Sequence, residues 1–212
     1  MEERSRREEN AEATRRGLVE AARALFTERG YADTPTEEIV RRSRVTRGAL
    51  YHHFTGKQDL FRAVLEEVNG RVSDAIAGRA LEQTDVWTGV IRGIDAFLDA
   101  CLDPAYQRIV LLDGPAVLGW EEWRQIGERH GLGIIRAALT QAVDEGAIEP
   151  QPIEPLAHML HGALNEAGMH IARSEDVEAA RVEAGTSVFR LIEGLRTVHP
   201  GAPQPKGRSR GS

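Results

Sequence analysis

Cysteine is almost absent from this sequence, because a chain of 212 residues holds only Cys101. A single cysteine excludes an internal disulfide framework and a zinc site built from cysteine ligands, and it is typical of a reducing compartment. Long apolar stretches are lacking too. No run approaches the roughly 18 apolar residues of a membrane span, and the charged segment 2–12 has no signal-peptide core. We therefore expect a cytoplasmic protein without a membrane partner.

Lysine is also scarce, since 25 of the 27 basic residues are arginine. The net charge of −6 at first argues against a nucleic-acid partner. The two signs are unevenly distributed, however. Residues 1–65 carry 13 basic against 11 acidic side chains, whereas residues 66–212 carry 14 against 22. The basic surplus therefore lies in the N-terminal third of the chain, where it favours contact with a nucleic acid.

Signals for strands and for catalysis are missing as well. No apolar–polar alternation and no Asn-Gly hairpin signal occurs. Ser43 and Ser73 lack the context of a nucleophile elbow, and no glycine-rich phosphate loop follows a strand. We expect an all-α fold that has no enzymatic activity, no catalytic residues and no cofactor.

Helical periodicity runs through most of the chain instead. An apolar stripe that includes Leu18 and Leu25 predicts a first helix that stops at Gly30. A long helix is expected over about 57–78. Further helices are expected at about 86–101, 106–112, 120–145, 152–173 and 176–198, with a break at Asp113-Gly114-Pro115. Residues 200–212, which are rich in Pro, Gly, Ser and basic side chains, are expected to form a disordered tail.

Residues 34–54 predict two short helices joined by a tight turn. Thr34 can cap the first, Pro35 suits its first position, and Glu37 completes a capping box. Thr46 can cap the second. That helix begins with a small, polar surface around Arg47, which suits close approach to a DNA major groove. Arginine can bind guanine with two hydrogen bonds, and hydroxyl and imidazole groups can bind phosphates.

The pattern of residues in this region resembles the N-terminal domain of TetR-family transcription repressors. The resemblance covers about residues 12–72 and rests on Ala22, Leu25, Phe26, Gly30, Tyr31, Thr34, Ile39, the run from Val45 to Phe54, Lys57, Leu60 and Phe61. Two places depart from the family. Pro35 stands where Thr or Ser is usual, and Ser43-Arg44 replaces Ala-Gly. Because glycine permits a positive φ in that turn, Arg44 must accept strain or use a variant turn.

The resemblance implies a three-helix, helix-turn-helix DNA-binding domain at 12–72, with the motif at about 35–54, and a helical ligand-binding and dimerisation domain at 73–199. Double-stranded operator DNA is then the expected partner. The residues predicted to contact it are Thr36, Arg44, Thr46, Arg47, Gly48, Tyr51, His52 and Lys57. The alternative for Arg47 is an ordinary solvated arginine, and for Tyr51 a half-buried core position.

The last two predicted helices are rich in small residues, which let helices approach closely. Intrachain packing would explain this composition. A DNA-binding protein with one helix-turn-helix also needs a second copy of itself to span two half-sites. The resemblance implies that the last two helices of each copy pair across a two-fold axis. We favour the homodimer.

A small-molecule site is expected in the C-terminal part. A mostly apolar cavity with a few polar groups is what such a site requires. The predicted lining is Phe97, Trp120, Trp123, His130, Ile134, His161, Asn165 and Met169. Core aromatics and solvated histidines would explain the same residues. His158 and His161, and Glu166 and His170, resemble metal-ligand pairs, but the two pairs lie about 100° apart around one helix, so no metal is predicted.

Taken together, the sequence predicts a homodimeric, ligand-responsive repressor. It would bind a palindromic or pseudo-palindromic operator and be released by a small, mostly apolar effector. The alternative is a small-molecule or metal-sensing carrier domain without a DNA role.

Overall fold

The computed structural model of the protein describes residues 2–196, and the expected tail at 200–212 lies outside them. The described residues form no strand, and one isolated bridge joins Ile148 to Arg196. The all-α prediction is confirmed. The elements are α1 (Glu2–Arg29), α2 (Thr36–Ser43), α3 (Arg47–His53), α4 (Lys57–Leu81), α5 (Val86–Ala100), the π-helix η1 (Tyr106–Asp113), α6 (Gly114–Leu118), α7 (Trp120–Asp144), α8 (Ile153–Arg173) and α9 (Val177–Glu193).

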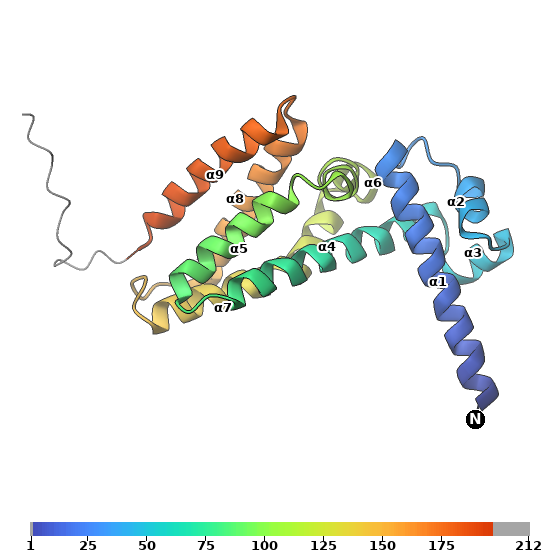
Figure 1. Ribbon diagram of the computed structural model, residues 1–212, viewed down its shortest axis with the longest axis horizontal. Helices are drawn as coiled ribbons and strands as arrows, with labels where there is room; N and C mark the ends of the chain where they lie inside the picture. Colours follow the sequence, from blue (N-terminus) through green and yellow to red (C-terminus); the bar gives the residue numbers. More distant parts are fainter. Residues whose placement is uncertain (1, 197–212) are drawn as a thin grey trace, which may run out of the picture.

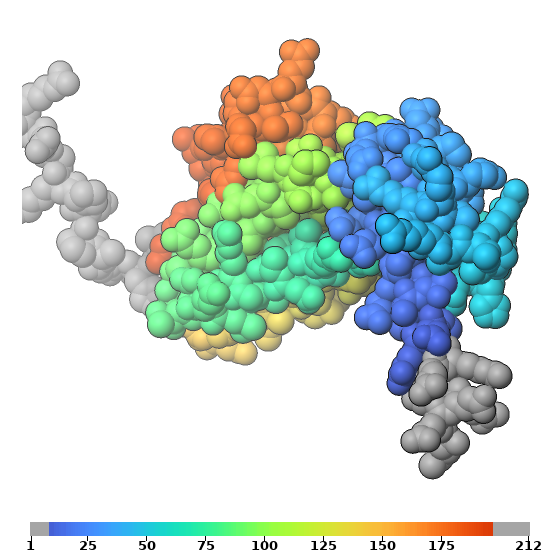
Figure 2. Space-filling model, turned by 45° about the vertical axis from the view of Figure 1, so that its right-hand side comes forward, coloured from blue at the N-terminus to red at the C-terminus, as the bar shows by residue number. Residues whose placement is uncertain are grey.

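The helices form an N-terminal unit and an elongated C-terminal bundle. Helices α1, α2 and α3 lie together at one end, and α4 runs from them along the bundle of α5, α7, α8 and α9 (Figure 1). The space-filling view shows α4 exposed along one edge of the bundle and passing behind the N-terminal unit (Figure 2). One continuous helix therefore belongs to both parts of the molecule.

The two short helices begin differently from each other. Thr46 caps α3, as predicted, and its hydroxyl accepts a hydrogen bond from the Ala49 backbone at 3.2 Å. The capping role predicted for Thr34 is wrong, because Pro35 occupies the cap of α2 without a side-chain bond. Thr34 is fully buried and donates its hydroxyl to the Gly30 carbonyl at 2.7 Å. It thereby satisfies a carbonyl at the end of α1 that has no partner within the helix.

The turn between α2 and α3 keeps a left-handed residue although glycine is missing there. Arg44 has φ 57° and is the only non-glycine residue with a positive φ in the described chain. Its backbone N–H bonds back to Arg41, and the next N–H, of Val45, reaches the Val40 carbonyl at 3.4 Å. Arg44 therefore accepts the left-handed strain of about 1–2 kcal/mol.

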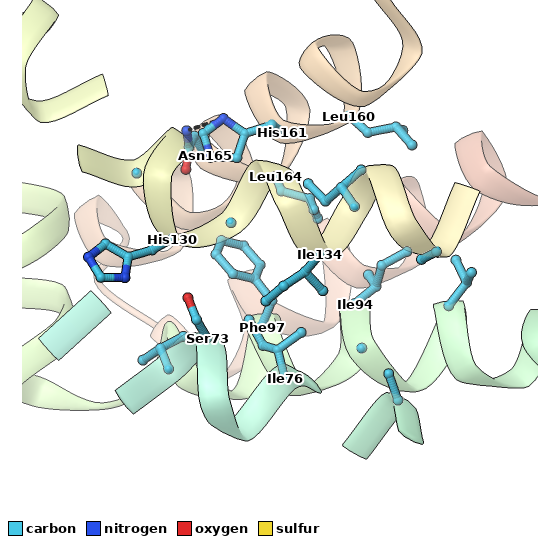
Figure 3. Close-up of a pocket in the computed structure, with 18 of the residues that line it drawn as sticks. Ser73, Ile76, Ile94, Phe97, His130, Ile134, Leu160, His161, Leu164 and Asn165 are labelled. Carbon is cyan, nitrogen blue, oxygen red and sulfur yellow. Dashed lines mark hydrogen bonds between the residues drawn. The ribbon is translucent and has the colours of Figure 1, made fainter. Parts of the chain in front are cut away.

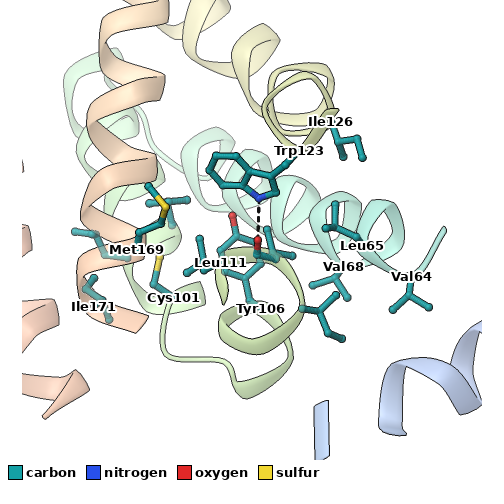
Figure 4. Packing of buried hydrophobic residues seen from close by; sticks show 14 of the residues in the cluster. Val64, Leu65, Val68, Cys101, Tyr106, Leu111, Trp123, Ile126, Met169 and Ile171 are labelled. Atoms are coloured by element: carbon teal, nitrogen blue, oxygen red, sulfur yellow. Dashed lines mark hydrogen bonds between the residues drawn. The ribbon is translucent and has the colours of Figure 1, made fainter. Parts of the chain in front are cut away.

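The break predicted at Asp113-Gly114-Pro115 is wrong. Helix η1 continues directly into α6, and the chain turns only at Gly119, which has φ +84°. In a π-helix the carbonyl of residue 110 would accept from residue 115, which is this proline. The Trp123 indole donates to the Val110 carbonyl instead, at 2.8 Å (Figure 4).

The last helix is shorter than expected. Helix α9 ends at Glu193, whereas the sequence predicted an end near residue 198, which lies outside the described residues.

Candidate functional site

Helix α3 presents an exposed polar surface at the N-terminal end of the molecule. Six of the eight residues predicted to contact DNA are exposed, namely Arg44, Thr46, Arg47, Gly48, Tyr51 and His52. The Arg47 guanidinium lies 3.6 Å from the Glu37 carboxylate and 5.7 Å from the centre of the Tyr51 ring. The Arg47 side chain keeps 67% of its surface exposed. Exposed pairs of this kind are weak, so Arg47 can exchange Glu37 for another partner.

The other two predicted residues, Thr36 and Lys57, are half-buried at the starts of α2 and α4. The Lys57 ammonium lies 4.2 Å from the centre of the Tyr31 ring, and burial lowers the pKa of Lys57. No side chain caps α4 at Gly56, and uncapped backbone N–H groups at a helix start attract anions such as phosphate. Lys57 and the start of α4 therefore form a cationic edge beside α3.

Helix η1 ties the C-terminal bundle to the end of α1. The Asp113 carboxylate accepts from the Tyr31 backbone N–H at 2.7 Å and lies 3.4 Å from the Arg108 guanidinium. Arg108 also donates to the Arg29 carbonyl at 3.5 Å. The bond from Asp113 therefore links the bundle to Tyr31, whose ring contacts the Lys57 ammonium.

A cavity of about 120 Å³ lies inside the bundle, between α4, α5, α7 and α8 (Figure 3). Five of the eight residues predicted to line such a cavity do line it: Phe97, His130, Ile134, His161 and Asn165. The sequence interpretation missed Asn69, Ser73 and Tyr106. Asn69 and Ser73 are one turn apart on α4 and therefore lie on the same face of the helix. This spacing was the signal in the sequence that could have identified them as cavity residues.

Trp120, Trp123 and Met169 do not belong to this lining, which corrects the prediction for these three residues. Trp120 is 56% exposed, and its ring packs against Trp123, with ring centres 4.9 Å apart. Trp123 and Met169 are both buried in the core, and Met169 lies beside Cys101 (Figure 4). Trp123 shares a helix face with His130 but lies two turns closer to η1, beyond the end of the cavity.

Two of the polar groups that line the cavity have shifted pKa values. Burial lowers the pKa of His161, and its Nδ1 lies 3.4 Å from the Asn165 side-chain nitrogen. Burial also raises the pKa of Tyr106, so its hydroxyl stays protonated. No Asp, Glu, Lys or Arg is among the described residues that line the cavity.

The histidines of α8 point to different places. His161 faces the cavity, whereas His158 lies on the surface, 3.4 Å from Glu128 and 3.4 Å from Glu154. Across residues 9–196, no group of three or more His, Cys, Asp or Glu side chains is arranged to hold a metal ion. In the same part of the chain, no helix is both long and apolar enough to cross a membrane.

Comparison with known proteins identifies both parts of the chain. A family model described as "Bacterial regulatory proteins, tetR family" matches residues 18–64, and one described as "Tetracyclin repressor-like, C-terminal domain" matches residues 87–195. The chain belongs to the TetR family. Members of this family are DNA-binding transcription regulators and not enzymes.

Individual TetR-family relatives match over most of the chain. The TetC protein of transposon Tn10 from Escherichia coli is 28% identical over 172 residues, covering 81% of this chain and 85% of TetC. The regulator SrpR from Pseudomonas putida is 44% identical over 143 residues, or 65% of each chain. The crystal structure of a TetR-family regulator from Pectobacterium atrosepticum superimposes with a TM-score of 0.81 at 32% identity, covering 89% of this chain and 97% of that one.

Proposed function

We propose that this TetR-family regulator is a homodimeric repressor that binds a palindromic or pseudo-palindromic operator and is released by a small, mostly apolar effector. The observation that carries the proposal is that α4 has one end beside the exposed face of α3 and contributes Ser73 and Ile76 to the cavity. The carrier alternative gives no role to α3. The family to which the chain belongs argues against it.

DNA reading is assigned to α3 and to the start of α4. Arg47 would read a base edge in the major groove, because arginine forms two parallel hydrogen bonds with guanine. Lys57 and the first backbone N–H groups of α4 would bind phosphate and set the register of the protein on the duplex. The exposure of Arg47 and the position of Lys57 at the start of α4, shortly after α3 ends, support this division of roles.

Dimerisation is assigned to the outer face of α8 and α9, which we call the α8–α9 face. A shallow groove runs between the two helices, with small residues such as Ala163, Ala167 and Ala184 in its lining. Leu191, which also lines the groove, is 56% exposed. Small residues let a partner helix approach, and exposed apolar side chains mark an interaction surface. A two-fold axis here would place two α3 helices one turn of DNA apart, at ~34 Å.

Release requires that the effector binds one state of the dimer better than the other. An occupant of the cavity would contact the middle of α4, and a tilt of this helix would move Lys57 and α3 together. The hydrogen bonds from η1 to the end of α1 give the bundle a second connection to the N-terminal unit. The effector would therefore change the distance between the two α3 helices.

The proposal is tested by selecting sites from random duplex DNA with the purified protein and measuring their affinity by fluorescence anisotropy. We expect a two-fold related site bound by two protomers, with specific binding ~10³-fold or more tighter than binding to unrelated DNA. A protein that remains monomeric and selects no sequence would support the carrier alternative instead.

A further inference from the structure

The cavity is small, and no Asp, Glu, Lys or Arg is among the described residues that line it. Its volume is about 120 Å³, somewhat less than the roughly 150 Å³ of an engineered apolar cavity that binds benzene. An occupant of about one ring fits this space. A carboxylate or an ammonium group would be buried without an opposite charge, which is strongly unfavourable.

Polar groups gather at one end of the cavity. Figure 3 shows Ser73, His130, His161 and Asn165 at one side of the site and Ile94 at the other. The order of residues along the helices agrees, because on α4 the polar residues precede Ile76 and Ala80, and on α7 His130 precedes Ile134. The apolar end is formed by Ile76, Ala80, Val90, Ile94, Ile135, Leu139 and Ile192. The cavity therefore suits a molecule with one hydrogen-bonding end and one apolar end.

Tyr106 supplies an unused hydrogen-bonding group to this site. It lines the cavity, is 4% exposed, and packs edge-on against Phe97 with ring centres 6.3 Å apart. Within the described residues its hydroxyl forms no hydrogen bond, and its oxygen is not one of the atoms that are sealed from solvent without a partner. The hydroxyl is therefore open to a ligand in the cavity, which could bond to it.

Resting on the proposed function, we propose that the effector is an uncharged single-ring molecule carrying a hydroxyl group, and that Tyr106 selects the hydroxyl. A hydroxyl donates one hydrogen bond and accepts others. Tyr106, Ser73 and neutral histidine each offer a donor and an acceptor, so a hydroxyl satisfies them in more than one arrangement. The ring then lies toward Phe97 and Ile134, with its apolar edge toward Ile94.

The test uses calorimetric titration of the full-length protein at neutral pH with four probes that differ in one group. These are para-cresol, toluene, para-toluate and benzylammonium. Para-cresol should bind most tightly, toluene more weakly, and the two ions at least ~100-fold more weakly than para-cresol, because their charges would be buried without a partner.

The variant Tyr106→Phe removes the hydroxyl but keeps the ring, so it tests the contribution of the hydroxyl to binding apart from that of the cavity's shape. It should weaken para-cresol about tenfold, the loss of one hydrogen bond, and leave toluene unchanged. Tyr31→Phe is the matched control, because Tyr31 also packs against phenylalanine but does not line the cavity, and it should change neither affinity.

Four outcomes would overturn the inference. With the wild-type protein, these are tighter binding of either ion than of para-cresol, and no binding of any of the four probes. With Tyr106→Phe, they are an equal loss of affinity for para-cresol and toluene, and an unchanged affinity for para-cresol. Operator selection by the same protein preparation separates such a failure from a failure of the proposed function, because it needs no effector.

Discussion

Arg47 is the residue whose loss should most change the choice of DNA sequence. Arg47→Ala should cost ~1–3 kcal/mol of operator binding and relax the preference at one base pair in each half-site, because one two-bond contact to a base is lost. Anisotropy titrations against the operator and its single-base variants measure this. Arg92→Ala is the matched control, since Arg92 is an exposed arginine on α5, far from α3 along the chain. Equal affinities for wild type and Arg47→Ala would contradict the assignment.

Lys57 should act on all sequences alike. Lys57→Ala removes a phosphate contact, so it should weaken operator and unrelated DNA by a similar factor. It should also reduce the slope of log affinity against log salt by about one. Titrations at several salt concentrations give that slope. A variant that changed sequence preference and kept the slope would assign Lys57 to base reading instead.

His161 should make stability depend on pH. Burial lowers the pKa of His161 below its usual 6.5, so the folded protein prefers the neutral ring. The corresponding stability is fully present above a pH of about 6.5 and declines as the pH falls through that value toward the folded pKa. Urea unfolding at pH values of about 7.5 and 5.5 should show a larger loss for wild type than for His161→Gln. The exposed His52→Gln serves as control. Equal losses in wild type and His161→Gln would remove His161 as the cause.

At the scale of elements, helix limits were more predictable than connections. Capping by Thr46 and the start of α4 at Lys57 were both expected, because each depends on neighbouring residues alone. Thr34 was assigned wrongly, since its hydroxyl is taken by the end of α1, which is a tertiary contact. A helix was expected at 106–112, but its π-helical form was not, because the Val110 carbonyl takes its hydrogen bond from Trp123, a residue of a different helix.

Trp123 should therefore stabilise the junction of η1 and α6. Trp123→Phe leaves the buried Val110 carbonyl without its donor, and we expect it to lower the free energy of unfolding by about 1–3 kcal/mol. Urea unfolding monitored by circular dichroism measures the change. Trp120→Phe, at the exposed neighbour, should change stability by no more than about 0.5 kcal/mol. Comparable losses in the two variants would show that the indole bond contributes little.

At the scale of the whole molecule, the family and the two-part architecture were predicted from the pattern of residues in 12–72. The cavity was only partly predictable. A helical wheel shows on which face of a helix a residue lies but not its position along the axis. Trp123 and Met169 were therefore included in the predicted cavity lining although they lie outside it. Tyr106 was missed because it lies in η1, whose neighbours are set by tertiary packing. In the last helix, an apolar seam that includes Leu191 and Leu195 also favoured a dimer interface. Leu195 packs against the core of its own chain, whereas Leu191 is exposed.

The dimer prediction therefore rests on Leu191. Leu191→Glu places a charge on the α8–α9 face and should convert the dimer to monomers that bind operator weakly. Sedimentation velocity measures the assembly state. Leu81→Glu is the matched control, because Leu81 is 84% exposed at the end of α4, and it should remain dimeric. If Leu191→Glu also sediments as a dimer, the interface lies on another surface.

The most direct test of the central claim is the distance between the two N-terminal units of the dimer, measured by electron–electron double resonance. A spin label at Glu20→Cys lies on the exposed surface of α1. Cys101 should not react, because it is buried and its thiol pKa is raised to about 12. We predict one distance population, which shifts on the order of a few Å when para-cresol fills the cavity. A missing dipolar signal, or a distance that stays constant while calorimetry shows bound para-cresol, would contradict a ligand-responsive dimer.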